Sequence, residues 1–382
     1  MSKKGFYSII LLAALLTSCG GKENTSASED KSEDTSASIS DAKTMEGTGT
    51  EEDPYTIGNI DQLEDFAATY TEHPGSYYKL TADINYNNTW SPIGTGTEED
   101  DGEFFGYFDG NGHSITNLKF TATNEEGLVG FFGIAASSYI HDLSVSVTID
   151  LTISKLCEEA YIGSIVAFGD NTIVDNCSVN ILKGKIASNQ PASDASIYVG
   201  GLMAYAQYYD PTGDAIMTSY NSNNSVKGNI RLSADKTPTA AVGGVIGYIN
   251  TGYFYGQSSI VNNKFEGIIE GGTYVGGIIG TNTAYVGLAN NVVKSESITT
   301  YGNSYSYAGG IIGQAVSDSS VTGNIAEVTT IKANKSSLPY IYTPSILGIF
   351  KYAWYLVSST ISINSLIFLT LSLLKQHILT HT

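Results

Sequence analysis

The chain has 382 residues, with 41 Gly, 26 Tyr, 8 Pro and a single Arg, and its formal net charge is −19 at pH 7. Residues 20–334 contain all 38 acidic residues and 14 of the 19 basic ones, which gives this part a net charge of −24. This sign disfavours nucleic acids and anionic membrane surfaces as partners, and it leaves neutral glycans, cationic surfaces and divalent ions open.

The chain begins with a segment typical of export. Lys3 and Lys4 precede the apolar stretch Ile9–Leu16, and small residues lead to Cys19. This arrangement resembles the lipobox of bacterial lipoproteins, in which the cysteine carries the lipid and becomes the first mature residue. The resemblance implies a signal peptide over residues 1–19 and a membrane anchor, such as palmitate, on Cys19. The alternative is an ordinary secretory signal.

Residues 20–46 are rich in Ser, Thr, Lys and Glu and carry almost no apolar side chains, which predicts a disordered tether. The acidic residues soon after Cys19 loosely resemble surface-export signals of Gram-negative lipoproteins. We therefore expect an outer-membrane protein of the cell envelope that is exposed at the cell surface.

Residues 47–125 are expected to form a cap and the first coils of a solenoid. Ile60, Leu63, Phe66 and Ala67 share one face of a short helix, for which Asn59 or Asp61 is the N-cap. Such a helix covers the open end of a stack of strands. The first strands are expected within 77–84, 90–94 and 105–118.

Residues 126–334 contain a repeated motif of the form Gly-Gly-Φ-Φ-Gly, where Φ is apolar. The copies that begin at Gly243, Gly276 and Gly309 match it in full, the copy at Gly200 ends in alanine, and the copies at Gly163 and Glu126 are weaker. The first position of the motif falls at 126, 163, 200, 243, 276 and 309, so the successive intervals are 37, 37, 43, 33 and 33. An Asn- or Asp-containing turn follows each copy, as in Ile260–Phe265 and Val321–Ala326. Recurrence of this kind predicts a solenoid whose coils stack to build one core, with glycine allowing close backbone approach or a positive φ.

The opening Gly-Thr-x-x-x-Pro-Tyr-x-Ile, the segment Phe105–Leu118 and the Gly-Gly-Φ-Φ-Gly copies together resemble GLUG-motif proteins. These are bacterial cell-surface proteins that include adhesins and the repeat regions of some IgA-cleaving metalloproteases. Over residues 47–334 the resemblance implies an all-β fold, a right-handed parallel β-helix with a short N-terminal capping helix. It implies no single activity, because the repeats are a scaffold.

No catalytic motif is found. None of the five His residues lies in His-Glu-x-x-His, and Arg231 is the only arginine and falls in an expected loop. Asp109 and Asp142 are the candidates for the carboxylate pair of a glycosidase. The segment Asp109–His113 lacks the spaced ligands of a calcium loop and is interpreted as a tight turn. We expect no metal and no cofactor.

Tyrosines near the coil edges are the candidate ligand contacts, since exposed rings stack on sugars or line protein interfaces. The alternative is that they face the core or stack between coils. The candidates are Tyr205, Tyr208, Tyr209, Tyr253, Tyr255, Tyr301 and Tyr305.

Two cysteines remain in the repeats. Cys157 and Cys177 lie in neighbouring units, one coil step apart if the coils are as short as their separation. Either a disulfide or two buried free thiols fits an extracytoplasmic setting.

Residues 335–382 differ in composition from the rest. The chain has no acidic residue after Glu327, and Tyr352–Leu374 carries no charge. A membrane span, a frame-shifted or truncated end, and a buried end-cap are the three interpretations.

The sequence as a whole predicts a monomeric, lipid-anchored surface protein that binds a glycan or a host surface protein. A β-helix carbohydrate-active enzyme and the structural stalk of a larger surface protein are the alternatives.

Overall fold

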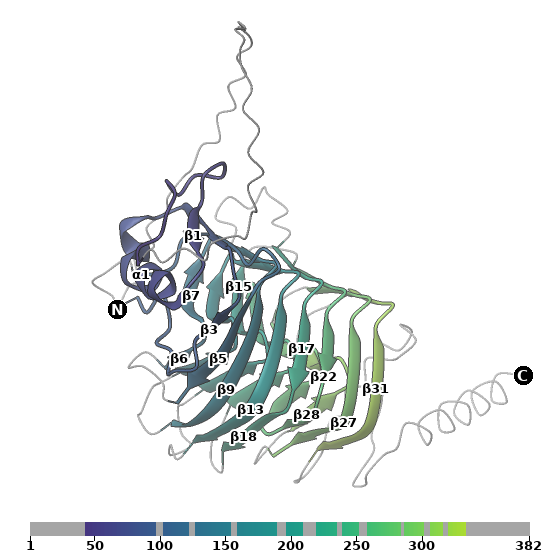
Figure 1. The fold of residues 1–382 in the computed structure, drawn as a ribbon. Coiled ribbons are helices and arrows are strands. Elements are labelled where there is room, and N and C mark those ends of the chain that lie inside the picture. The colour runs from purple at the N-terminus through teal and green to yellow at the C-terminus, as the bar shows by residue number, and fades with distance from the viewer. Residues whose placement is uncertain are drawn as a thin grey trace, which may run out of the picture. The chain divides into compact units, whose positions relative to one another are not determined.

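The computed structural model describes residues 43–96, 102–121, 127–153, 159–188, 196–208, 219–234, 239–251, 258–283, 286–301, 306–315 and 320–333, all within one compact unit. These residues form strands that pair in parallel into four sheets (Figure 1). In each repeat the chain passes through sheets I, II, III and IV in turn and then returns to sheet I one level further on. The expected all-β architecture with parallel strands is confirmed.

Sheets I and II each receive one strand from every coil from β6 onward. Sheet I contains β6 (Leu128–Val129), β10 (Glu159–Gly163), β14 (Ser196–Gly200), β19 (Thr239–Gly243), β24 (Tyr274–Gly276) and β28 (Tyr307–Gly309). Sheet II contains β7 (Phe132–Ala136), β11 (Val166–Asp170), β15 (Met203–Tyr208), β20 (Ile246–Thr251), β25 (Ile279–Asn282) and β29 (Ile312–Ala315).

Sheets III and IV extend further toward the N-terminus. Sheet III contains β1 (Tyr55–Ile57), β2 (Ser76–Leu80), β4 (Gly106–Asp109), β8 (Tyr139–His141), β12 (Ile173–Asp175), β16 (Ser219–Ser222), β21 (Ser258–Val261), β26 (Val286–Ala289) and β30 (Ser320–Thr322). Sheet IV contains β3 (Ile84–Asn85), β5 (Ser114–Phe120), β9 (Ser144–Ile153), β13 (Ser178–Ser188), β17 (Ser225–Gly228), β18 (Ile230–Ala234), β22 (Lys264–Glu266), β23 (Ile269–Glu270), β27 (Val292–Thr300) and β31 (Ile325–Ala333).

The spacing of the repeated motif equals the length of a coil. Register partners on successive strands of sheet I are Gly163, Gly200, Gly243, Gly276 and Gly309, the same positions that the motif marks in the sequence. The structure corrects the position of the first copy of the motif. Ile162 pairs with Val129, so the residue that aligns with Gly163 is Gly130 rather than Glu126.

Each Gly-Gly pair lies at the corner between sheets I and II, and close approach is the reason for glycine there. A Cβ on Gly244 would lie 2.1 Å from the carbonyl oxygen of Gly277, and one on Gly277 would lie 2.1 Å from that of Gly310. Backbone atoms of the next coil therefore occupy the space that a side chain would need.

Asparagine has two distinct roles at the corner between sheets III and IV. Asn176, Asn223, Asn262 and Asn290 adopt a left-handed backbone, with φ from 50 to 59°, as expected for turn asparagines. The next position forms the asparagine ladder, which consists of the buried residues Asn224, Asn263, Asn291 and Asn324. In the ladder each side-chain oxygen accepts from the backbone N–H of the preceding coil, and each amide group donates to a carbonyl there.

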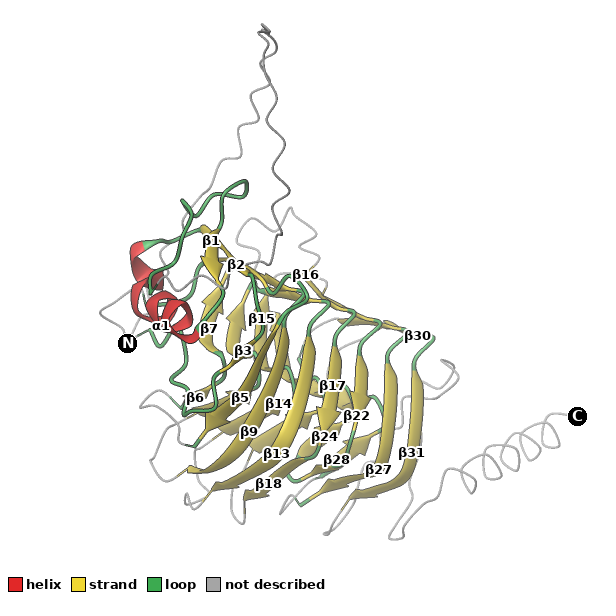
Figure 2. Ribbon diagram, viewed as in Figure 1, coloured by secondary structure: helices red, strands yellow, loops and turns green. Residues whose placement is uncertain are grey.

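The N-terminal end is covered by α1 (Ile60–Thr69), the one α-helix among the described residues, which a 3-10 turn (Tyr70–Glu72) follows (Figure 2). Asn59 is its N-cap and accepts from Gln62 N. Phe66 packs on the aromatic rings of the first strands. The predicted helix face is wrong at Ile60, which is 40% exposed, because Gln62 is buried in its place. The Gln62 side chain accepts a hydrogen bond from Gly58 N and donates one to the carbonyl oxygen of Thr44.

Several predicted segments lie outside the described residues, among them the signal peptide, Cys19 and the tail 335–382. The last residues of the expected tether belong to the folded part. Glu46 forms an isolated antiparallel β-bridge with Thr56, and Met45 N donates a hydrogen bond to the Asp65 carboxylate. No helix in the described residues is long and apolar enough to cross a membrane.

Candidate ligand-binding groove

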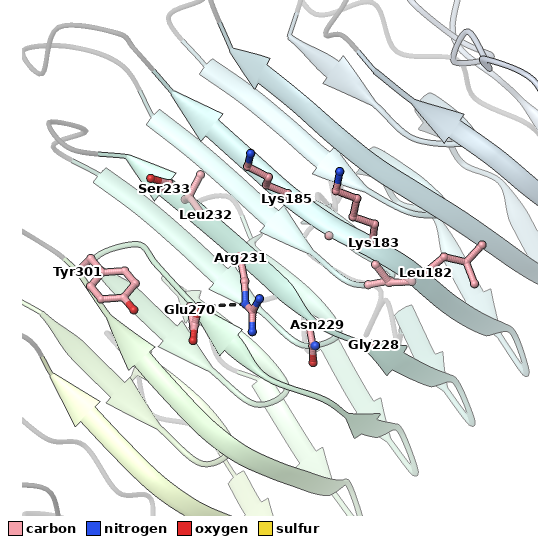
Figure 3. A pocket seen from close by; sticks show the side chains of 12 residues that line it. Leu182, Lys183, Lys185, Gly228, Asn229, Arg231, Leu232, Ser233, Glu270 and Tyr301 are labelled. Atoms are coloured by element: carbon pink, nitrogen blue, oxygen red, sulfur yellow. Dashed lines mark ion pairs between the residues drawn. The ribbon is translucent and has the colours of Figure 1, made fainter.

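A groove of about 850 Å³ lies on sheet IV, where the strands kink (Figure 3). The residue Leu182 is an insertion in β13, which shifts its register against β9 between Ile181 and Lys183. One coil further on, Gly228 ends β17 with a φ of 127°, and Asn229 separates β17 from β18. A Cβ on Gly184 would lie 2.1 Å from the carbonyl oxygen of Asn229, so the backbones meet closely there. The kink leaves a depression between the outward side chains on either side of it.

Charged side chains cross the groove in register. Asp150, Lys185, Arg231 and Glu270 are successive partners on β9, β13, β18 and β23. The Nε atom of Arg231 lies 3.1 Å from Oε2 of Glu270, and Lys183 forms an ion pair with Asp150. The five charges sum to +1, from three cations and two carboxylates. This part of an acidic protein is therefore locally cationic.

Tyr301 forms the far side of the groove, one coil beyond Glu270. Its side chain is 44% exposed. Partial burial raises its pKa, and Glu270 acts in the same direction while Arg231 opposes it. The ring thus lies within electrostatic range of both members of the ion pair.

The groove combines an exposed aromatic face, hydrogen-bond donors and one acceptor carboxylate. Figure 3 shows Arg231 between Glu270 and the strand that bears Lys183 and Lys185. Such a set suits a sugar, because an aromatic ring can pack on the apolar faces of the sugar while charged groups bond its hydroxyls or carboxylates.

Of the predicted ligand contacts, Tyr301 is the one that the structure places on this exposed surface. Tyr205 and Tyr208 were expected near a coil edge, but they are buried, with 9% and 2% exposure. Asn221 donates to the Tyr208 hydroxyl, and the Tyr205 ring is enclosed by its neighbours. The remaining candidates lie outside the described residues, namely Tyr209, Tyr253, Tyr255 and Tyr305.

Tyr205 belongs to an aromatic cluster on the corner between sheets I and II. Its ring centroid is 4.9 Å from those of Phe168 and Tyr248, its neighbours in sheet II. Tyr161 and Tyr198 of sheet I pack against it edge-on. Burial raises the pKa of Tyr198 to about 12. These rings stack between coils, as the alternative interpretation of the tyrosines predicts.

Sequence reasoning missed the charged part of the groove. Arg231 was expected in a loop but lies in β18, directly opposite Lys185. The signal available was its uniqueness, since it is the only arginine in the chain. The groove brings together side chains from four coils. Their proximity depends on the strand register of sheet IV and on the bulge at Leu182, neither of which can be deduced from the sequence.

The other predicted residues lie elsewhere. Asp109 and Asp142 come together around His141 at the ends of β4 and β8. Asp109–His113 forms a tight turn, with a φ of 51° at Asn111.

Cys177 is a buried free thiol, and Cys157 lies outside the described residues. One coil step runs from Gly163 to Gly200, which is nearly twice the separation of the two cysteines along the chain. The idea that they are one coil step apart is therefore wrong, because their separation corresponds to about half a coil.

No family model matches the sequence. The chain is 36% identical to halomucin from Haloquadratum walsbyi over 97 residues, which are 23% of this chain and 1% of halomucin. It is also similar to a crystal structure of a Bacteroides ovatus protein that is provisionally named an immunoglobulin A1 protease, with a TM-score of 0.48 and 20% identity over 83% of this chain and 85% of that one. Neither likeness assigns an activity to this chain.

Proposed function

We propose that this chain is a lipid-anchored surface protein whose right-handed β-helix binds glycans that carry carboxylate groups. The observation that supports this most is the groove, where exposed Tyr301 lies beside the Arg231–Glu270 pair and Lys185. Right-handedness is supported by the strong preference of parallel strand connections, about 98%, for that hand.

The choice of an acidic glycan follows from local charge. Lys185 has Arg231 as its neighbour, and the groove carries a net charge of +1 within a chain of −19. A ligand carboxylate between Lys185 and Arg231 would relieve their repulsion and gain charge-assisted hydrogen bonds. The rest of the surface repels polyanions at long range, but at physiological salt this repulsion is screened within about 8 Å.

The test is binding of the full chain to an array of neutral and acidic glycans, with product analysis on every hit. Uronate- or sialate-bearing glycans should bind and remain uncleaved. Tyr301→Ala should weaken binding at least about tenfold, or 1.4 kcal/mol. The matched control is Tyr107→Ala, which removes another exposed tyrosine, 39% exposed, from sheet III. Turnover of a glycan, or equal loss in both variants, contradicts the proposal.

The anchor is a separate part of the proposal and rests on the sequence around Cys19. Cys19→Ser should move the protein from the membrane fraction to the soluble fraction and abolish incorporation of a palmitate analogue. A variant that stays in the membrane fraction would point to another anchor, such as the uncharged stretch near the C-terminus.

A further inference from the structure

Three potential metal ligands converge on the outer surface of sheet III. Asp109 ends β4, His141 ends β8 and Asp142 follows in the turn. Within the described part of the chain this is the one group of three or more His, Cys, Asp or Glu residues whose ligand atoms all lie within 4.8 Å of one another. Phe108 and Ile140 are fully buried, so alternation along the two strands directs Asp109 and His141 outward.

Both carboxylates approach the same ring nitrogen. Asp142 Oδ2 lies 2.7 Å from His141 Nδ1, and Asp109 Oδ1 lies 3.7 Å from it. Two ligands of a tetrahedral zinc ion, each at about 2.0 Å from the metal, are about 3.3 Å apart. The two nitrogen–oxygen distances bracket that value, and all three ligand atoms lie within 4.8 Å of one another. Side-chain shifts of at most about 1.5 Å would therefore bring all three atoms into coordination.

The second oxygen of each carboxylate is held by another group. Lys79 Nζ lies 3.2 Å from Asp109 Oδ2, and Asn176 Nδ2 donates to Asp142 Oδ1. The His141 ring stacks on Tyr139, with centroids 4.5 Å apart. Partners of this kind fix the orientation of metal ligands in known sites.

Glycine permits the two turns to meet. A Cβ on Gly110 would lie 2.3 Å from the Cα of Leu143 and 2.4 Å from the carbonyl oxygen of Asp142. The absence of a side chain therefore lets the turn after β4 lie directly on the turn after β8 and brings Asp109 close to Asp142.

We propose that Asp109, His141 and Asp142 bind a divalent transition-metal ion, with zinc as the preferred ion and water completing its coordination. An imidazole nitrogen with two carboxylates suits zinc and its neighbours, whereas calcium and magnesium prefer oxygen ligands alone. Two carboxylates balance the two charges of the ion. The site lies on sheet III and is separate from the groove of sheet IV.

Zinc binding to the full chain, measured by competition with a chromophoric chelator, tests the site. The variants are His141→Gln and Asp142→Asn, and both should fold. His141 points outward, and asparagine already occupies the left-handed position of Asp142 in the following coils, at Asn176 and Asn223. Circular dichroism verifies folding.

The matched control is His113→Gln. His113 Nδ1 lies 3.7 Å from Asp83 Oδ1, so it is a His–Asp pair without a second carboxylate. We expect the wild type to bind one zinc ion. The affinity for zinc should fall about tenfold or more in both site variants and remain unchanged in the control. Absence of zinc binding at micromolar concentrations, equal affinity in His141→Gln and the wild type, or equal loss in His113→Gln would each overturn the site.

Discussion

Lys185 and Arg231 are direct register partners on β13 and β18, so two cations face each other across neighbouring strands of sheet IV. Elsewhere in this sheet the partners have opposite charge, as with Lys227 and Glu266, whose charged atoms are 3.1 Å apart. Like charges in facing positions destabilise a sheet. Asp150 and Glu270 are the partners of these two cations on their other sides, and the acidic ligand proposed above would add an anion between the cations themselves.

This contrast leads to the first prediction. Lys185→Gln should leave the free energy of unfolding within about 0.5 kcal/mol of the wild type, or raise it, while weakening acidic-glycan binding. Lys227→Gln removes an opposite-charge pair and should lower stability slightly without affecting binding. Urea denaturation and array binding of both variants give the result. A Lys185→Gln protein with unchanged binding would remove this residue from the proposed contact set.

The second prediction concerns the asparagine ladder. Asn263→Ala would leave the N–H of Asn224 and the carbonyl of Asn221 without side-chain partners in a buried place. Its cost should be about 2–4 kcal/mol of unfolding free energy in chemical denaturation. Asn262→Gly is the control, because that neighbour is exposed and its left-handed φ of 59° suits glycine; its cost should be at most about 0.5 kcal/mol. Equal costs would show that the ladder bonds contribute little.

Asp170 gives a third prediction, on pH. Burial and then the charge of Glu103 raise its pKa to about 6, and its Oδ1 atom has no hydrogen-bond partner among the described residues. An unfolded aspartate titrates near 3.9, so the native state binds the proton more tightly and stability falls as pH rises from about 4 to about 6. Asp170→Asn should therefore be more stable than the wild type at pH 8, by about 1–3 kcal/mol, and equal to it below pH ~4.

Denaturation of both proteins at the two pH values measures this difference. Asp83→Asn serves as the control of opposite sign, because hydrogen bonds from Ser114 lower the pKa of Asp83. That stability contribution is present above the unfolded pKa and is lost as pH falls through the folded one. A destabilised Asp170→Asn protein at pH 8 would mean that the carboxylate has a partner in the folded state.

The fourth prediction concerns Cys177. Burial raises the pKa of its thiol to about 12, and Sγ lies 3.3 Å from the carbonyl oxygen of Asp175. Iodoacetamide at pH 8 should leave it unmodified in the native protein and alkylate it in denaturant, as peptide mass mapping would detect. A disulfide-linked peptide joining Cys157 and Cys177 would contradict the free thiol.

Much of the fold was accessible from the sequence because glycine and asparagine report backbone geometry directly. The Gly-Gly copies from Gly163 onward gave the coil lengths, and the turn asparagines gave the left-handed positions. The cap was recognised from Asn59, Leu63 and Phe66. Burial of Gln62 instead of Ile60 was not accessible, because it depends on partners at Gly58 and Thr44.

The candidate site was less accessible, because it depends on which residues align between coils. Alternation along a strand tells which side chains point outward, but the unequal coil lengths and the insertion at Leu182 decide which of them become neighbours. Tyr301 was found through its residue type. The alignment of Lys185 with Arg231 needed the register.

The asparagine ladder also has a consequence for how such a chain evolves. The side-chain oxygen of each ladder asparagine accepts a hydrogen bond from a backbone N–H of the preceding coil. The same bond therefore repeats from coil to coil, from the N–H of Cys177 to the side chain of Asn324. A coil copied in frame would find donors and acceptors in place on both sides, so duplication or deletion of one coil needs no new interface. The coil from Gly200 to Gly243 is longer than the coil from Gly243 to Gly276, which fits this mode of growth, since insertions between strands leave the rungs aligned.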